Sequence, residues 1–331
     1  MAGGIISSKK SFNLIRFFLQ WEWMLVILII AVIVVNSIIS GNYASINGLM
    51  DATMVFLDKS FIVLTMVFII IMGDIDISVA SNIALSSVVM SVTHSAGVNM
   101  IASMLIGLLV GAGCGFINGI LVSRFKELSA IIVTLATMSI YRGIAYVILG
   151  DQVVSDFPDW FSYFGWGYVG NTIIPFMLAA FIFFAIIFAL ILHKTSFGRR
   201  VFAIGNSQES SRFSGIPVER IKLIVFTLTG LMCAVSAIFL TSRLGSSRPN
   251  IAQGYELEII AVVVLGGVSI NGGKGRMLGA VLALFVIGLA RYAMGLKNIP
   301  GQVMIVAIGL LLIFSVMLPN LLKKIKISKI Y

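Results

Sequence analysis

Long, unbroken apolar runs recur along this chain, and no other feature constrains its fold as strongly. Of its 331 residues, 59% are hydrophobic and only 11% are charged, whereas a soluble domain has about 25% charged residues. So few charges cannot cover a water-facing surface, and the sequence therefore predicts that lipid surrounds much of the molecule. Helices are the expected spanning structure because each satisfies its own backbone hydrogen bonds. The apolar runs lack the short alternating segments of a membrane barrel.

The apolar runs predict an all-α, polytopic transmembrane helical bundle of about ten helices, since each run approaches the length that crosses a bilayer. The first run, Met24–Ile39, follows basic residues but is longer than the apolar core of a signal peptide. It is long enough to span the bilayer as a helix, so we interpret it as a retained helix. The predicted spans are 24–40, 54–73, 79–95, 100–123, 129–149, 172–192, 221–243, 256–270, 276–296 and 300–320.

The positions of Lys and Arg predict the orientation of the bundle. The net charge is +10, and in a membrane protein basic residues gather on the cytoplasmic side. With both termini in the cytoplasm, most Lys and Arg residues fall in inside segments, including the basic loop 193–220. The loop 151–171 has three Asp, no Lys or Arg, and several aromatic residues, so it is expected outside. The chain then divides into a cytoplasmic segment (1–23), a transmembrane domain (24–320) and a cytoplasmic basic tail (321–331).

The loop 193–220 is the longest segment predicted on the cytoplasmic side. Ser207 can cap a short helix that has Glu209 and Ser210 in its first turn. Such a helix, lying across the membrane surface, could be gripped by a transport motor. The alternative is an ordinary basic loop held near anionic lipid, and the residues alone favour neither.

Polar residues inside or between apolar runs are costly in lipid and need partners. Asp74 and Asp76 admit three interpretations: a cytoplasmic loop, a helix start with acids at its positive end, or a polar break in a transport path. Asn118 is expected to form a structural hydrogen bond with a neighbouring helix. Arg142 needs a partner or must reach the outer interface.

Four glycines at a spacing of four residues lie on one face of the predicted helix 100–123. Small residues at that spacing allow helices to approach closely in lipid. The stripe therefore predicts tight packing within the bundle, with a contribution to a pathway wall as the alternative. The residues are Gly107, Gly111, Gly115 and Gly119.

Little in the chain indicates catalysis. The two histidines, His94 and His193, are predicted on opposite sides of the membrane, and no metal-ligand spacing occurs. The glycines near 272–275 do not form a phosphate loop, because Arg276 follows where the pattern needs Lys and then Ser or Thr. Cys114 and Cys233 lie in apolar runs and are expected to be buried, reduced thiols.

Several segments, in order along the chain, resemble the ABC permease family that imports ribose, xylose, rhamnose and related sugars. Within the loop 193–220 they are TSFGRR (195–200), AIGN (203–206) and SGI (214–216). Elsewhere they are MGDIDISVA (72–80), GFINGILV (115–122), IVTLATM (132–138), GYELEIIA (254–261) and VLGGVSINGGKG (264–275). Asp74 stands where the family has its second glycine, and Ala80 where it has its last. The IDISVA variant and the opening Trp21–Trp23 favour the rhamnose or autoinducer-2 branch.

The resemblance implies that the loop 193–220 docks into paired ATPase subunits, with the docking helix between Gly205 and Gly215. The residues expected to couple to the ATPase are Gly198, Arg199, Gly205, Asn206, Glu209, Ser210 and Gly215. The candidates for a translocation pathway or gate are Asp76, Ser78, Asn82, Asn118, Thr134, Glu256, Gly266 and Gly267.

By this resemblance the chain is a permease subunit in the cytoplasmic membrane, not an enzyme. Its expected partners are a cytoplasmic ABC ATPase, a second permease copy or paralogue, an extracytoplasmic sugar-binding protein and membrane lipid, with no nucleic acid. It needs no cofactor of its own; ATP and Mg²⁺ belong to the ATPase. The alternatives are a branched-chain amino acid ABC permease or an ion-coupled secondary carrier that uses intramembrane acids as relays.

Overall fold

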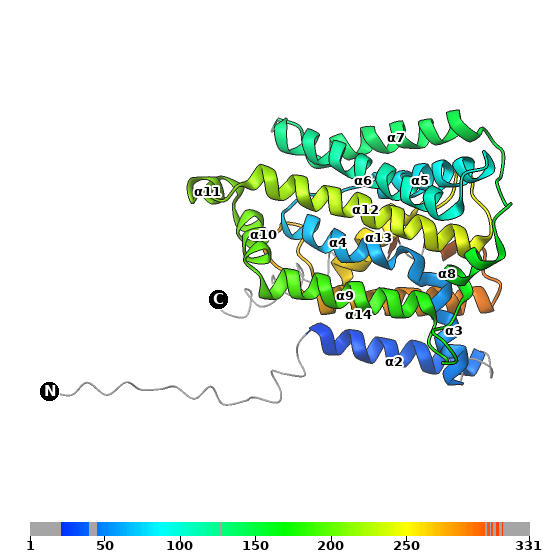
Figure 1. Ribbon diagram of the computed structural model, residues 1–331. Helices are drawn as coiled ribbons and strands as arrows, with labels where there is room; N and C mark the ends of the chain where they lie inside the picture. Colours follow the sequence, from blue (N-terminus) through cyan, green and yellow to red (C-terminus); the bar gives the residue numbers. More distant parts are fainter. Residues whose placement is uncertain are drawn as a thin grey trace.

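The computed structural model describes residues 21–39, 45–125 and 127–301, together with 303, 304, 306, 309, 310 and 313. This part of the chain is a helical bundle, as predicted, with no β-sheet (Figure 1). Residues 1–20, the basic tail and most of the tenth predicted span lie outside the described residues. The main helices are α2 (Trp21–Ile39), α3 (Ile46–Phe56), α4 (Ser60–Ile71), α5 (Val79–Ser95), α6 (Met100–Arg124), α7 (Ala130–Leu149), α9 (Phe176–Lys194), α10 (Ser196–Asn206), α11 (Gln208–Phe213), α12 (Val218–Leu244), α13 (Tyr255–Leu265) and α14 (Met277–Leu296).

Seven helical segments within the described residues are long and apolar enough to cross a membrane. One of them runs from Ile46 to Ile71, where α3 continues through the 3-10 turn η2 (Leu57–Lys59) into α4. It starts earlier than the predicted span 54–73 because Ser45 caps α3, accepting a hydrogen bond from the amide of Gly48 at 3.0 Å. The exposed polar residues Asn47 and Asp51 hide this first part from a search for apolar runs.

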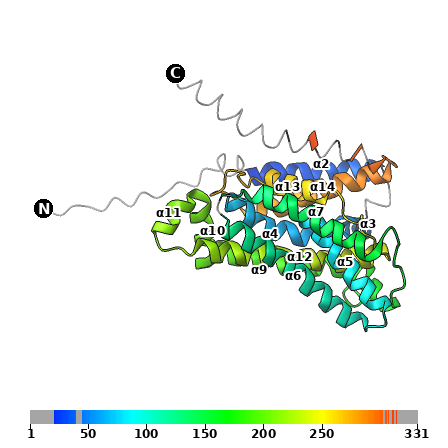
Figure 2. The same cartoon turned by 90° about the horizontal axis from the view of Figure 1, so that it is seen from above.

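Helix α4 is the centre of the bundle. All of its residues are buried, as expected for a helix that is apolar all round. Helices α9, α12, α13 and α14 pack around it. Seen from above, α2 and α14 lie along one edge of the molecule and α6 along the opposite edge (Figure 2).

Two interrupted helices, α4 and α13, meet where each one ends. Helix α13 stops at Leu265, short of the predicted end at 270, because Gly267 adopts a positive φ of 84°. The following loop returns to α4, where the amide of Gly273 donates to the carbonyl of Ile71 at 2.8 Å. At about 1.5 Å per residue, the 11 residues of α13 are too short to cross the hydrocarbon core alone.

The glycine stripe on α6 packs closely against neighbouring helices, which confirms the structural interpretation. A Cβ atom on Gly115 would lie 2.3 Å from the carbonyl oxygen of Phe226 in α12, and one on Gly111 would lie 2.6 Å from the Cβ of Ala234. Gly119 also faces α12, whereas Gly107 faces α5. Backbones can approach this closely only where side chains are absent.

The long helices run between two ends of the bundle (Figure 1). We call them the α11 end, which also carries α10, and the α8 end, named for the short helix α8 (Tyr163–Trp166) that follows the 3-10 turn η3 (Asp159–Ser162). The basic loop 193–220 lies at the α11 end and the loop 151–171 at the α8 end. This separation is what the charge pattern predicted for loops on opposite sides of the membrane.

Candidate functional site

The loop 193–220 folds into two short capped helices at the α11 end. Thr195 caps α10, accepting from the amide of Gly198 at 3.3 Å. Ser207 caps α11 in the same way, accepting from the amide of Ser210 at 3.1 Å. The predicted cap and short helix are therefore confirmed. Gly215, with a φ of 77°, turns the chain from α11 into α12.

The exposed side of this helical pair carries several of the predicted coupling residues. They are Arg199, Asn206, Glu209, Ser210 and Gly215. Sequence reasoning missed Phe213 at the end of α11, whose side chain is 86% exposed. The signal was available, because Phe213 is the one aromatic residue in an otherwise polar helix, QESSRF. An exposed aromatic residue of this kind is typical of an interface anchor.

Two other predicted coupling residues, Gly198 and Gly205, are packed against backbone. A Cβ atom on Gly198 would lie 1.9 Å from the carbonyl oxygen of Leu192, and one on Gly205 would lie 1.7 Å from that of Ile71. These glycines therefore position α10 against α9 and α4. A force applied to α10 would reach the end of α4 directly, and one applied to α11 would reach it through α10.

A cavity of about 340 Å³ opens beside α11. Its wall includes Gln208 and Arg212 of α11, the loop after α4, and the start of α7. Lys222 of α12 and Asp74 also line it, and their Nζ and Oδ2 atoms form an ion pair of 2.8 Å with both side chains below 10% exposure. Asp74, which departs from the family pattern, thus has a partner on a different helix.

Five of the predicted pathway residues lie in the region where the connection from α4 to α5 meets α6 and α7. The hydroxyl of Ser78 donates to Asp76 Oδ1 at 2.7 Å, and Asn118 Nδ2 donates to that hydroxyl at 2.7 Å. Asp76 also accepts from the amide of Ser78, at the N-terminus of α5, so it lies at a helix start. Thr134 accepts from the amide of Ile77 at 3.2 Å.

The same polar cluster continues along α5, α6 and α7. Tyr141 donates to Asn118 Oδ1 at 3.0 Å, which satisfies the amide expected to bond between helices. Asn82 Nδ2 donates to the carbonyl of Gly111 at 3.2 Å. Asp76, Asn82 and Asn118 are all almost fully buried. The cluster is therefore closed to solvent in this conformation, with its hydrogen bonds made inside the protein.

The remaining pathway candidates, Glu256, Gly266 and Gly267, are not part of this cluster. Glu256 lies in the first turn of α13 and is half-buried. Gly266 packs against α14, because a Cβ atom there would lie 2.5 Å from the Cα of Ala280. Gly267 provides the left-handed turn that ends α13. The structure thus gives the two glycines packing and turning roles.

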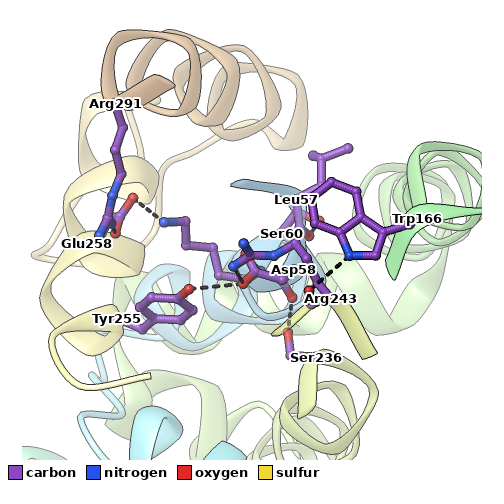
Figure 3. A network of polar contacts seen from close by, with 10 residues as sticks. Leu57, Asp58, Ser60, Trp166, Ser236, Arg243, Tyr255, Glu258 and Arg291 are labelled. Carbon is purple, nitrogen blue, oxygen red and sulfur yellow. Dashed lines mark hydrogen bonds and ion pairs between the residues drawn. The ribbon is translucent and has the colours of Figure 1, made fainter. Parts of the chain in front are cut away.

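A second polar site, at the α8 end, was not predicted (Figure 3). Asp58 Oδ2 pairs with Arg243 Nη2 at 2.9 Å and accepts from the hydroxyl of Tyr255 at 2.9 Å. Glu258 pairs with Lys59 at 2.5 Å and also with Arg291. Ser236 and Trp166 donate to the carbonyls of Asp58 and Arg243 at 2.5 and 2.9 Å.

This network joins η2, α12, α13 and α14 through charges that are almost completely buried. Asp58, Lys59 and Glu258 are each at most 2% exposed. Sequence analysis did not single out Lys59, and of the two nearby glutamates it named only Glu256. These charges come from segments far apart in the sequence, and hydropathy gives no signal for which of them pair, so the network could not be predicted.

Two further contacts fix the α8 end. Arg142 of α7, which needed a partner, donates from Nη1 to the carbonyls of Pro249 and Ile251 at 2.5 and 2.8 Å. Tyr168 donates its hydroxyl to Asp51 at 2.7 Å, and this hydrogen bond to a carboxylate raises the pKa of the tyrosine. Among the residues described, no cluster of His, Cys, Asp and Glu is arranged to hold a metal ion.

The chain matches a known protein family over most of its length. Residues 48–318 match the family model described as branched-chain amino acid transport system / permease component. The L-arabinose transport system permease protein AraH of Escherichia coli (strain K12) is 35% identical over 322 residues, covering 96% of this chain and 95% of AraH.

Two other relatives are named for different substrates. The autoinducer 2 import system permease protein LsrD of Photorhabdus luminescens is 33% identical, covering 89% of this chain and 90% of LsrD. The ribose import permease protein RbsC of Bacillus subtilis (strain 168) is 34% identical, covering 86% of this chain and 88% of RbsC. No solved structure matches the chain significantly.

Proposed function

The chain belongs to the branched-chain amino acid transport system / permease component family, and from that premise we propose that it is the membrane-spanning permease of an ABC sugar importer. It carries a monosaccharide or related polyol across the cytoplasmic membrane. The energy comes from ATP, with Mg²⁺, hydrolysed on a partner ATPase. Relatives named for arabinose, ribose and autoinducer 2, with coverage of at least 86% of this chain, support the sugar class over amino acids.

The observation that carries this proposal is the helix α11 at the end of the bundle. It is capped on its own, presents Phe213 to solvent, and is tied to α12 by an ion pair of 2.9 Å between Arg212 and Glu219. An exposed aromatic residue at the tip of a capped helix favours a permease that docks on a partner over an ion-driven carrier acting alone. The α11 end is accordingly the cytoplasmic end, and α11 is the helix that inserts into the ATPase.

Motion of α11 has a physical route into the membrane. Gly205 holds α10 against the end of α4, and the loop after α13 bonds to the same carbonyl of Ile71. The polar cluster around Asp76, Ser78 and Asn118 begins a few residues beyond this junction. We place the pathway along this cluster, which opens when the junction shifts. A second permease copy or paralogue completes the pathway, and an extracytoplasmic binding protein delivers the sugar.

The test is ATP-dependent uptake in vesicles that contain the permease, its ATPase and its binding protein. Radiolabelled arabinose, ribose and leucine are compared, and a sugar is expected to accumulate while leucine does not. Phe213→Ala is expected to reduce both copurification of the ATPase and uptake by about thirtyfold, because an aromatic anchor buried in the interface contributes ~2 kcal/mol.

Phe183→Ala is the matched control, since Phe183 is 60% exposed on α9 within a span. It should leave ATPase binding unchanged. Uptake that persists without the ATPase but stops with an uncoupler would identify a secondary carrier instead. Accumulation of leucine alone would assign the chain to amino acid transport.

A further inference from the structure

A cavity of about 360 Å³ lies beside the charged network at the α8 end. Three cations form its polar wall, Lys59, Arg243 and Arg291, together with Tyr255 and Tyr292. Neither carboxylate of the network, Asp58 or Glu258, is among the described residues that line it. Among the described residues, the wall contains no Asp or Glu. The cavity therefore presents positive charge and hydrogen-bond donors.

The side chains of this network carry a net positive charge. Three cations share two carboxylates, Asp58 and Glu258. The Nε atom of Arg243 is buried and has no hydrogen-bond partner. The side chain of Arg291 is 31% exposed, whereas Lys59 is 3% exposed. An excess positive charge is costly at low dielectric, and an anion in the cavity would neutralise it.

The rest of the wall is apolar. Val55, Phe56, Leu296 and Met304 line it, and Val55 is also 40% exposed on the surface of α3. Trp166 and Tyr168 lie at the same end, and such aromatic residues mark the depth of lipid headgroups. A ligand for this cavity therefore combines an anionic head with an apolar body.

We propose that this cavity binds the phosphate group of a membrane phospholipid, held by Lys59, Arg243 and Arg291, with acyl chains along the apolar wall. Arg and Lys side chains bind phosphate oxygens through charge-assisted hydrogen bonds. The site is distinct from the polar cluster assigned to sugar, and it does not depend on which cargo the permease carries.

The experiment measures lipid retained by the purified full-length protein in native mass spectrometry. The probes are phosphatidylglycerol, which is anionic, phosphatidylcholine, which has the same phosphate but no net charge, and inorganic phosphate. Wild type is expected to retain phosphatidylglycerol over phosphatidylcholine. Arg291→Gln should weaken that retention roughly tenfold, since it removes a charge-assisted hydrogen-bond donor.

A second variant tests the cavity without touching an ion pair. Gly295 lines the cavity and has open space where a Cβ atom would be, so Gly295→Leu fills it while keeping the network intact. It should lower retention to a similar extent. Lys297→Gln removes an exposed cation just after α14, and Gly113→Leu adds the same side chain at an open position on α6; both should bind as wild type does.

The outcomes separate cleanly. If wild type retains inorganic phosphate alone and Gly295→Leu does not, the cavity is still an anion site. Its ligand is then a soluble phosphate and not a phospholipid. Equal retention of phosphatidylglycerol by wild type and Gly295→Leu would overturn the proposal. So would a loss in Lys297→Gln as large as that in Arg291→Gln, because the charge would then act at the surface.

Discussion

At the scale of single residues, the pair formed by Asp74 and Lys222 is the contact most open to test. Removing one partner leaves a buried charge without compensation. We expect Lys222→Met to lower the free energy of unfolding by about 3–5 kcal/mol. The double variant with Asp74→Asn should recover much of this loss, because neither charge then remains buried.

Thermal unfolding in detergent, followed by circular dichroism, provides the measurement. Arg220→Met is the control, since Arg220 is an exposed cation near the start of α12. A double variant that is no more stable than Lys222→Met would show that the two side chains do not depend on each other.

Residue pairings of this kind were the part of the site that sequence could not supply. The motif containing Asp76, Ser78 and Asn118 was visible because polar residues interrupted apolar runs. Lys59 and Glu258 are almost two hundred positions apart, and each resembles an ordinary charge at the end of a span. Only the packing of α13 against α4, the helix that directly follows η2, brings them together.

At the scale of the element, α11 depends on its cap. Ser207→Ala removes the side chain that accepts from the amide of Ser210, and we expect about 1 kcal/mol of local destabilisation. Hydrogen exchange of the α11 amides should then be about fivefold faster. Ser207→Asp keeps an acceptor at the cap and should exchange as slowly as wild type. Equal exchange rates in all three proteins would mean that packing of α11 against the rest of the protein, and not its cap, maintains this helix.

The observed helix boundaries match the predicted ones where a capping residue and the apolar pattern indicate the same position. Helix α5 spans Val79–Ser95, the same range as the predicted run, and the cap of α11 was placed at Ser207. The pattern was less informative at α3, whose first turns carry polar residues, and at α13, whose apolar run continues past its glycine turn. Hydropathy records neither the Ser45 side-chain cap that starts α3 nor the glycine turn that ends α13.

At the scale of the whole molecule, orientation is the prediction to test, and the chain suits cysteine labelling. Both native cysteines, Cys114 and Cys233, are buried, so wild type should stay unlabelled. A membrane-impermeant maleimide should label Thr172→Cys, at the α8 end, on intact cells. Ser214→Cys, at the α11 end, should react only after the membrane is permeabilised. Labelling of Ser214→Cys on intact cells would place the α11 end outside and remove the basis for ATPase docking.

The contact between α6 and α12 restricts how such a molecule can change shape. Where Gly111 and Gly115 touch Gly230 and Phe226, main chain rests on main chain, and no rotamer change can separate the two helices. The two helices are therefore expected to move together as one rigid body. We then expect bending where helices are already interrupted, and the breaks beyond Ile71 and Leu265 are two such places.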